Sequence, residues 1–240
     1  MAVAAAFVVI FAATETRPVF IAHTSLAQRL LSRAPVDSTF VRAPWLRSPA
    51  VWALSTPQFL RDREAFAHDL LKTGRMNQQR ASELADVAVR EAYKRRVPPA
   101  LVLGVMLVEN DAFKTNAKSR VGAVGLMQVH PRPWRPALAE IFGSDVKTDS
   151  VNLKYGIFIL GHLAKKAADE ADAERGWRGA LLRYNGCSEG RNTPDCHHYP
   201  EWVKRRVERQ AKTLCGGRSF GECVATPLWI AKRPDTGSGE

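Results

Sequence analysis

The segment from Val97 to Val129 constrains the fold more than any other part of this 240-residue chain. It reads VPPALVLGVMLVENDAFKTNAKSRVGAVGLMQV. Pro98 and Pro99 suit the first turn of a helix, where a missing N–H group costs nothing. Apolar residues then continue up to one acid, Glu109, and those three, four and seven positions before it share its helical face. The segment therefore predicts a mostly buried helix with a carboxyl group on its apolar face, near its C-terminus.

The setting of Glu109 predicts a carboxyl group that stays protonated near neutral pH. Burial disfavours the charged form, and the negative end of the helix dipole disfavours it again. Asp111 would add a like charge if it lies close. A protonated carboxyl group is what a general acid needs. The alternative is an acid at a helix end that contacts an N–H group or an arginine.

Three further motifs follow Glu109 in a fixed order. They are AKS at 117–119, GAVGLMQ at 122–128, with two glycines for a tight turn, and YNG at 184–186. Together these four elements resemble the lytic murein transglycosylases of the soluble-type (SLT) family. The resemblance covers roughly residues 85–215 and implies a mostly α, lysozyme-like domain, here with an N-terminal helical extension.

The resemblance implies that a groove binds a glycan strand of alternating N-acetylglucosamine and N-acetylmuramic acid. Glu109 matches the single catalytic acid/base of the family, and we expect no metal and no cofactor. The residues expected to bind the sugar are Ser119, Met127, Gln128, His130, Tyr184 and Asn185. Serine, amide and tyrosine groups suit the hydroxyl and amide edges of a sugar. The alternatives are that Ser119 caps a turn, Gln128 satisfies loop backbone groups and Tyr184 belongs to the core.

The chain departs from the family pattern at three points. Asn110 stands directly after the acid, where the family has Ser, and one extra residue precedes Phe113. The shape of that loop is therefore open. His130 stands where the family often has Met, and would add a titrating group near the sugar. After the Tyr-Asn pair the family has Ala-Gly, whereas this chain has Gly-Cys at 186–187, so a disulfide-bonded loop could reshape that end of the groove.

Four cysteines lie in the last quarter of the chain, at positions 187, 196, 215 and 223. An even number in polar, loop-like sequence predicts disulfides and an oxidising compartment. Four cysteines allow three pairings. We predict the sequential one, 187 with 196 and 215 with 223, because it closes short loops and residues 192–195 supply turn formers. Zinc fits poorly, since no C-x2–4-C pair exists.

The net charge of +11 indicates an anionic partner, for which nucleic acid, anionic lipid and cell-wall polymers all qualify. No basic block interleaved with aromatic residues occurs, and neither does a zinc-finger or RNA-binding signature, so we expect no nucleic-acid partner. The expected partner is the peptidoglycan glycan strand, and the expected state is a monomer. A solvated basic surface is the simpler alternative to a specific polyanion site.

The N-terminal apolar run at 2–13 is too short for a stable membrane span and about right for a signal-peptide core. Because no basic residue precedes it, the charge order is wrong for export. We interpret residues 1–27 as a damaged or misassigned export signal. Together with the cysteines, it predicts an exported protein that is periplasmic or associated with the cell envelope.

The remaining sequence predicts helices and no strand. The expected helices cover 57–72 after Thr56, 78–95 after Asn77, about 151–173 after Asp149-Ser150, 177–184 and 199–214. Expected buried positions are Phe59, Phe66, Leu70 and Leu71 in the first helix and 81, 84, 85, 88, 89 and 92 in the second. Prolines 131, 133 and 136 should break the chain around Trp134, leaving one or two helical turns at 136–142. The resemblance to the SLT family implies that Asn152 and Gly156 shape packing and are not catalytic.

The expected domain organisation has four parts: the export signal at 1–27, an arm with helices at 28–84, the transglycosylase domain at 85–215 and a tail at 216–240. The final eight residues should be disordered. Besides a lytic transglycosylase, the pattern allows a lysozyme- or chitinase-like hydrolase on the same fold. It also allows a non-catalytic wall-binding protein.

Overall fold

The computed structural model describes residues 56–166, 173–187 and 195–225. Within these ranges the chain is mostly helical and has no strand, as predicted. The expected export signal, most of the arm and the expected disordered end lie outside the described residues. Among the helices of the described ranges, none combines the length and the apolar content that crossing a bilayer requires.

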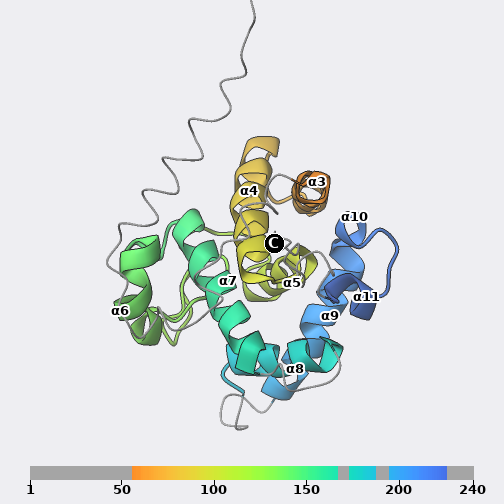
Figure 1. The fold of residues 1–240 in the computed structure, drawn as a ribbon. Coiled ribbons are helices and arrows are strands. Elements are labelled where there is room, and N and C mark those ends of the chain that lie inside the picture. The colour runs from red at the N-terminus through yellow and green to blue at the C-terminus, as the bar shows by residue number, and fades with distance from the viewer. Residues whose placement is uncertain (1–55, 167–172, 188–194, 226–240) are drawn as a thin grey trace, which may run out of the picture. The chain divides into compact units, whose positions relative to one another are not determined.

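The helices run in the order shown in Figure 1. They are α3 (Pro57–Lys72), α4 (Gln78–Arg95), α5 (Pro99–Glu109), α6 (Pro131–Phe142), α7 (Asp149–Lys166), α8 (Ala173–Tyr184), η2 (Cys196–His198), α9 (Tyr199–Gln210), α10 (Lys212–Cys215) and α11 (Phe220–Val224).

Helix α5 is the central element of the described core (Figure 1). Its residues from Pro99 to Leu107 are all buried, and it contacts α3, α4, α9, α10 and α11. Gly104 allows α9 to approach closely, because a β-carbon there would lie 2.5 Å from Val207 and 3.0 Å from Val203 of α9. The predicted buried helix that ends at Glu109 is thus confirmed, and α9 lies directly against it.

Helices α3 and α4 have the predicted bounds. Each is capped at its N-terminus by the side chain of the residue directly before it. The Thr56 side chain accepts a hydrogen bond from the N–H of Phe59 at 3.2 Å, and the Asn77 side chain accepts one from Arg80 at 2.9 Å. All six predicted positions of α4 are buried. In α3 the prediction of a buried Leu71 is wrong, since this side chain is only half-buried. It follows Leu70 by about 100° around the helix and so leaves the buried face.

Helix α6 contradicts the expected break around Trp134. It begins at Pro131, and its early prolines fall in the first turn, where their missing N–H groups have no helical partner to lose. Pro136 lies inside the helix and removes one bond. Ring contacts with α7 hold the helix in place, since Trp134 meets His162 edge-on at a centroid distance of 5.8 Å and Phe142 meets Phe158 at 5.8 Å.

Three other helix limits also differ from the sequence prediction. Helix α7 begins at Asp149, two residues early, and its described part ends at Lys166. Helix α8 begins at Ala173 and not at Trp177; the prediction missed the first turn because its sequence, Ala-Glu-Arg-Gly, has no apolar periodicity. The single helix expected at 199–214 is interrupted at residue 211, which separates α9 from α10.

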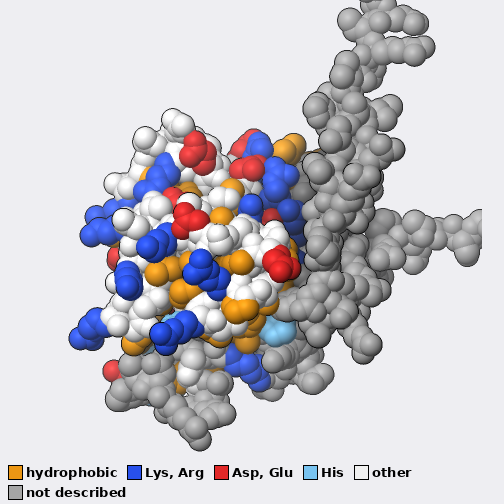
Figure 2. All heavy atoms as spheres, turned by 90° about the vertical axis from the view of Figure 1, so that its left-hand side faces the viewer, with side chains coloured by type: hydrophobic (Ala, Val, Ile, Leu, Met, Phe, Trp, Pro, Cys, Tyr) orange, Lys and Arg blue, Asp and Glu red, His pale blue; other side chains and the backbone are white. Residues whose placement is uncertain are grey.

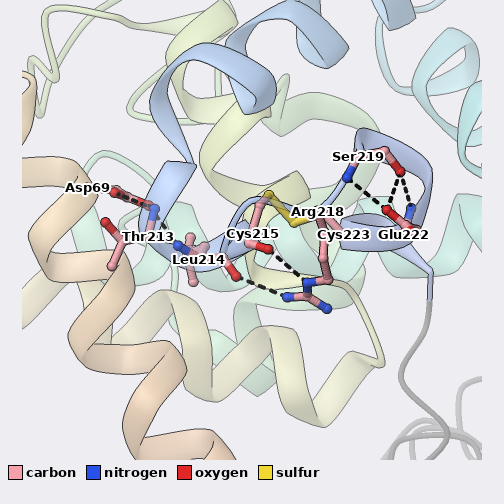
Figure 3. Close-up of a disulfide and its surroundings, with 8 residues drawn as sticks. All are labelled: Asp69, Thr213, Leu214, Cys215, Arg218, Ser219, Glu222 and Cys223. Carbon is pink, nitrogen blue, oxygen red and sulfur yellow. Dashed lines mark hydrogen bonds between the residues drawn. A yellow bond between two sulfur atoms is a disulfide. The ribbon is translucent and has the colours of Figure 1, made fainter.

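A residue from a distant helix causes the start of α10 (Figure 3). The buried carboxylate of Asp69 in α3 accepts hydrogen bonds from the backbone N–H groups of Thr213, at 3.0 and 3.1 Å, and Leu214, at 3.0 Å. These are the second and third residues of α10, so Asp69 caps this helix from outside its own sequence. A new helix therefore starts where the local pattern predicted continuation.

Helix α11 lies in the segment whose composition predicted only a tail. Its N-terminus carries a capping box, in which Ser219 and Glu222 bond each other's backbone N–H groups (Figure 3). The indole N–H of Trp177 donates to the carbonyl of Val224 at 2.9 Å, which ties α11 to α8. Sequence inspection could have found this helix from its S-x-x-E signature.

The distribution of positive charge can be followed on one face of the molecule (Figure 2). On the face that carries α6, Lys and Arg side chains are distributed around hydrophobic ones and do not form one block (Figure 2). This distribution is typical of a solvated basic surface.

Candidate active site

Glu109 is the last residue of α5, and its side chain is half-buried. Its Oε1 accepts a hydrogen bond of 2.6 Å from the hydroxyl of Tyr199, the first residue of α9. Burial raises the pKa of Glu109 to about 7, while the hydrogen bond from Tyr199 opposes the rise. A large part of the protein therefore carries a protonated Glu109 at neutral pH.

Asp111 does not contribute the like charge that the sequence allowed. Its side chain is exposed and forms an ion pair with Arg206 at 3.3 Å. Burial therefore accounts for the raised pKa of Glu109.

Tyr199 was missed by the sequence analysis. It lies 90 residues from Glu109 and is 2% exposed. No short sequence motif predicts that Tyr199 contacts Glu109, because this contact arises from the packing of α9 on α5. The one available signal was Gly104, since a glycine inside an apolar helix often marks the close approach of another element.

Tyr184, the last residue of α8, is the second tyrosine near Glu109. Its hydroxyl donates to the carbonyl of Met127 at 2.8 Å. Burial raises its pKa well above the ordinary value, and the charge of Glu109 raises it further. The pKa of Tyr199 is raised by burial first, then by Glu109 and by Tyr184. The structure thus brings Glu109, Tyr184, Tyr199 and the backbone of Met127 together.

The loop that contains Met127 is fixed from α7 by Asn152. The buried side chain of Asn152 accepts from the N–H of Met127 at 2.8 Å and donates to the carbonyls of Val124 at 2.8 Å and Val146 at 3.0 Å. Gly156 leaves room for Met127, since a β-carbon there would lie 2.5 Å from its sulfur. Asn152 and Gly156 therefore shape packing, as the family resemblance implied.

Gln128 and Ser119 make bonds within the same loop. The side-chain amide of Gln128 donates to the carbonyl of Gly125 at 2.9 Å, and the hydroxyl of Ser119 accepts from the N–H of Ala123 at 3.0 Å. These are the structural roles that the sequence left open for both residues. A hydroxyl that accepts can still donate, and the amide oxygen of Gln128 can accept, so both keep hydrogen-bonding capacity for a ligand.

His130 and Asn185 lie at the ends of their elements. His130 is exposed, and its Nε2 lies 3.0 Å from the carbonyl oxygen of Val121. The backbone N–H of Asn185 donates to Leu181 at 3.1 Å and so continues the last turn of α8. His130 thus contacts its own loop.

Asn110 joins the chain after Glu109 to the glycine-containing turn. Its buried side-chain amide donates to the carbonyls of Lys114 at 2.7 Å and Gly125 at 3.2 Å, and its oxygen accepts from the N–H of Lys114 at 3.1 Å. The buried Phe113 takes a positive φ of 50°, with which the chain turns back. The departure from Ser at position 110 therefore provides three bonds that order this loop.

Both predicted disulfides are confirmed. Cys187 is bonded to Cys196 with a Cα–Cα distance of 5.6 Å, and Cys215 to Cys223 with 5.1 Å. Within the described ranges, no group of three His, Cys, Asp or Glu side chains is placed to hold a metal ion.

Comparison with known proteins gave one family. Residues 86–193 match the family model described as the transglycosylase SLT domain. This range contains Glu109, the loop of Met127 and Tyr184, but ends before Tyr199. Searches of curated proteins and of solved structures gave no match.

Proposed function

Since residues 86–193 belong to the transglycosylase SLT family, whose members cleave peptidoglycan, we propose that this chain is a lytic transglycosylase. Its reaction would cut the β-1,4 bond between N-acetylmuramic acid and N-acetylglucosamine and form 1,6-anhydro-muramic ends. The observation that carries the proposal is the half-buried Glu109, whose pKa is raised to about 7, inside that domain. Two disulfides and this substrate fit a protein that acts outside the cytoplasm, in the periplasm or cell envelope.

In the proposed mechanism Glu109 transfers a proton twice. The protonated carboxyl group first donates to the glycosidic oxygen, and the bond between the anomeric carbon and that oxygen breaks. The 2-acetamido group of the muramic residue supports the positive charge at the anomeric carbon. The carboxylate then takes the proton of the C6 hydroxyl, whose oxygen bonds to the anomeric carbon. Glu109 ends protonated, and no water is consumed.

In this mechanism Tyr199 would stabilise the carboxylate form of Glu109, which exists between the two proton transfers. Once Glu109 has given up its proton, the hydroxyl of Tyr199 donates to a full carboxylate, and hydrogen bonds to charged groups are the stronger ones. The bond thus becomes more favourable as the reaction proceeds, which lowers the barrier.

A hydrolase ordinarily needs a second carboxylate near the first. Asp111 and Asp149 are engaged in ion pairs with Arg206 and Arg80 at 3.3 and 3.0 Å. The other candidates are exposed or outside the described residues; these are Glu140, Asp145, Asp195 and Glu189. The shift of the Glu109 pKa has burial and Tyr199 as its causes, with no contribution from a second acid in the described ranges. This favours the single-carboxylate mechanism.

Digestion of purified sacculi in ¹⁸O-water, followed by mass spectrometry of the released sugars, tests the proposal. We expect anhydro-muramic ends without label. Label at the new muramic ends would mean hydrolysis and would overturn the transglycosylase assignment.

The variant Glu109→Gln tests the role of the acid in the same assay. It should fold and lose at least about 10²-fold in rate, because the amide cannot donate and take back a proton. Glu140→Gln removes the same charge from an exposed position of α6 and should keep full activity. Turnover of Glu109→Gln within about threefold of wild type would remove Glu109 from the mechanism.

A further inference from the structure

The disulfide between Cys187 and Cys196 joins the two segments that carry the tyrosines of the site. Cys187 follows Tyr184 by three residues, and Cys196 precedes Tyr199 by three. The two tyrosines end α8 and begin α9, respectively. The cross-link therefore joins the end of the helix that carries Tyr184 to the start of the helix that carries Tyr199.

On the α8 side, the helix end holds Cys187 in a fixed place. The N–H of Gly186 donates to the carbonyl of Arg183 at 3.1 Å, and the N–H of Cys187 donates to Leu182 at 2.8 Å. With a φ of 77° at Gly186, these bonds form a Schellman motif. The glycine required for that motif stands directly after Tyr-Asn and directly before Cys187.

On the α9 side, the backbone of Tyr199 depends on the turn that contains Cys196. The N–H of Tyr199 donates to the carbonyl of Cys196, and the N–H of His198 donates to Asp195 at 3.0 Å. Neither η2 nor α9 has a side chain that caps its first turn. Arg178 of α8 forms an ion pair of 3.2 Å with Glu201 in the first turn of α9, but both side chains are exposed. The disulfide to Cys187 is the buried, covalent link between the start of α9 and the end of α8.

We infer that the Cys187–Cys196 disulfide is a positioning element that keeps the hydroxyl of Tyr199 on the carboxyl group of Glu109. The inference rests on the proposed function for its effect on catalysis. Both cysteines are buried, at 7% and 2% exposure, so the cross-link belongs to the packed structure around the site. Without it, the first turn of α9 keeps the exposed ion pair to α8 but loses its covalent tie, and Tyr199 no longer holds the distance of 2.6 Å to Glu109.

The second disulfide is a matched control. Cys215 and Cys223 are separated by 8 residues, compared with 9 for the first pair, so loss of either should reduce stability by a similar amount. It joins α10 to α11 next to the capping box of Ser219 (Figure 3). A difference between the two deletions would therefore reflect the site and not stability.

A double-mutant cycle separates positioning from simple stabilisation. Tyr199→Phe is introduced into wild type, C187S/C196S and C215S/C223S, and kcat/KM on sacculi is measured at about pH 5, where Glu109 is protonated. In wild type and in C215S/C223S we expect Tyr199→Phe to lower kcat/KM by roughly tenfold to a hundredfold. This factor corresponds to the loss of a hydrogen bond to a charged group. In C187S/C196S the same substitution should cost less than about threefold. Equal losses in all three backgrounds would overturn the inference.

A second readout does not depend on activity. The pKa of Glu109 is measured by NMR on protein with ¹³C-labelled glutamate, with Glu109→Gln used for assignment. Tyr199→Phe should raise this pKa in wild type and in C215S/C223S, and change it little in C187S/C196S. This pKa measurement does not depend on which reaction the protein catalyses. Failure of the positioning inference can therefore be distinguished from failure of the proposed function. An equal rise in all backgrounds would contradict the positioning role.

If C187S/C196S does not fold, the C215S/C223S protein provides the same comparison. Cys187–Cys196 is then the remaining disulfide, and excess dithiothreitol reduces it to two thiols while the reagent is oxidised to its cyclic disulfide. We expect the effect of Tyr199→Phe on the Glu109 pKa to disappear on reduction and to return on reoxidation. An effect that persists in the reduced protein would overturn the inference.

Discussion

The raised pKa of Glu109 makes the stability of the folded protein depend on pH, and Glu109→Gln should remove that dependence. The pKa is about 7 in the folded protein against an ordinary value of 4.5. Between these values the folded state binds a proton that the unfolded state has lost. Stability is therefore highest below pH 4.5, falls as pH rises towards 7 and levels off above it.

The size of this effect follows from the two pKa values. Each pH unit between them corresponds to about 1.4 kcal/mol, so ionisation of Glu109 costs about 3 kcal/mol of unfolding free energy at alkaline pH. Glutamine keeps the shape and can still accept from Tyr199, but carries no charge. At about pH 8 the variant should be more stable than wild type by about 3 kcal/mol, and at about pH 4 the two should be equal.

Urea denaturation followed by circular dichroism, repeated across this pH range, measures the difference. Glu140→Gln controls for the change in net charge, since it lies exposed on α6, and its curve should parallel that of wild type. If Glu109→Gln and wild type differ by the same amount at every pH, Glu109 has an ordinary pKa and the argument for a buried general acid is refuted.

Two other substitutions test single contacts. Tyr199→Phe removes a bond that lowers the pKa of Glu109, so the alkaline limit of kcat/KM should move upwards by about 1 to 2 pH units; an unchanged profile would contradict the contact. Asp69→Ala leaves two N–H groups at the start of α10 without an acceptor and should lower the unfolding free energy by about 3 kcal/mol, measured by urea denaturation. Asp69→Asn keeps one acceptor and should cost less, whereas equal costs would argue against this capping role.

The sequence was sufficient to predict those structural features that depend on residues close together in the chain. The bounds of α3 and α4 follow from Thr56 and Asn77, whose side chains bond N–H groups three residues later. The buried helix that ends at Glu109 follows from its apolar run, and the disulfide pairing from short loops. The family follows from motifs that each occupy only a few positions.

The sequence prediction was wrong where contacts between different helices outweighed a preference of the local sequence. Proline chemistry alone predicted a break around Trp134, but contacts of α6 with α7 stabilise a continuous helix. The periodicity of 199–214 predicted one helix, whereas Asp69 caps a second one. The composition after residue 216 concealed α11, although its capping box was legible in the sequence.

The sequence by itself determined the acid, the helix that buries it and the covalent links. Only the tertiary structure decided which hydroxyl meets that acid. Tyr199 lies 90 residues from Glu109, and its position results from the approach of α9 to α5 at Gly104. A helix has the same local pattern whichever neighbour it packs against. The partner of a buried carboxyl group is therefore fixed by the packing of whole helices, which no short stretch of sequence encodes.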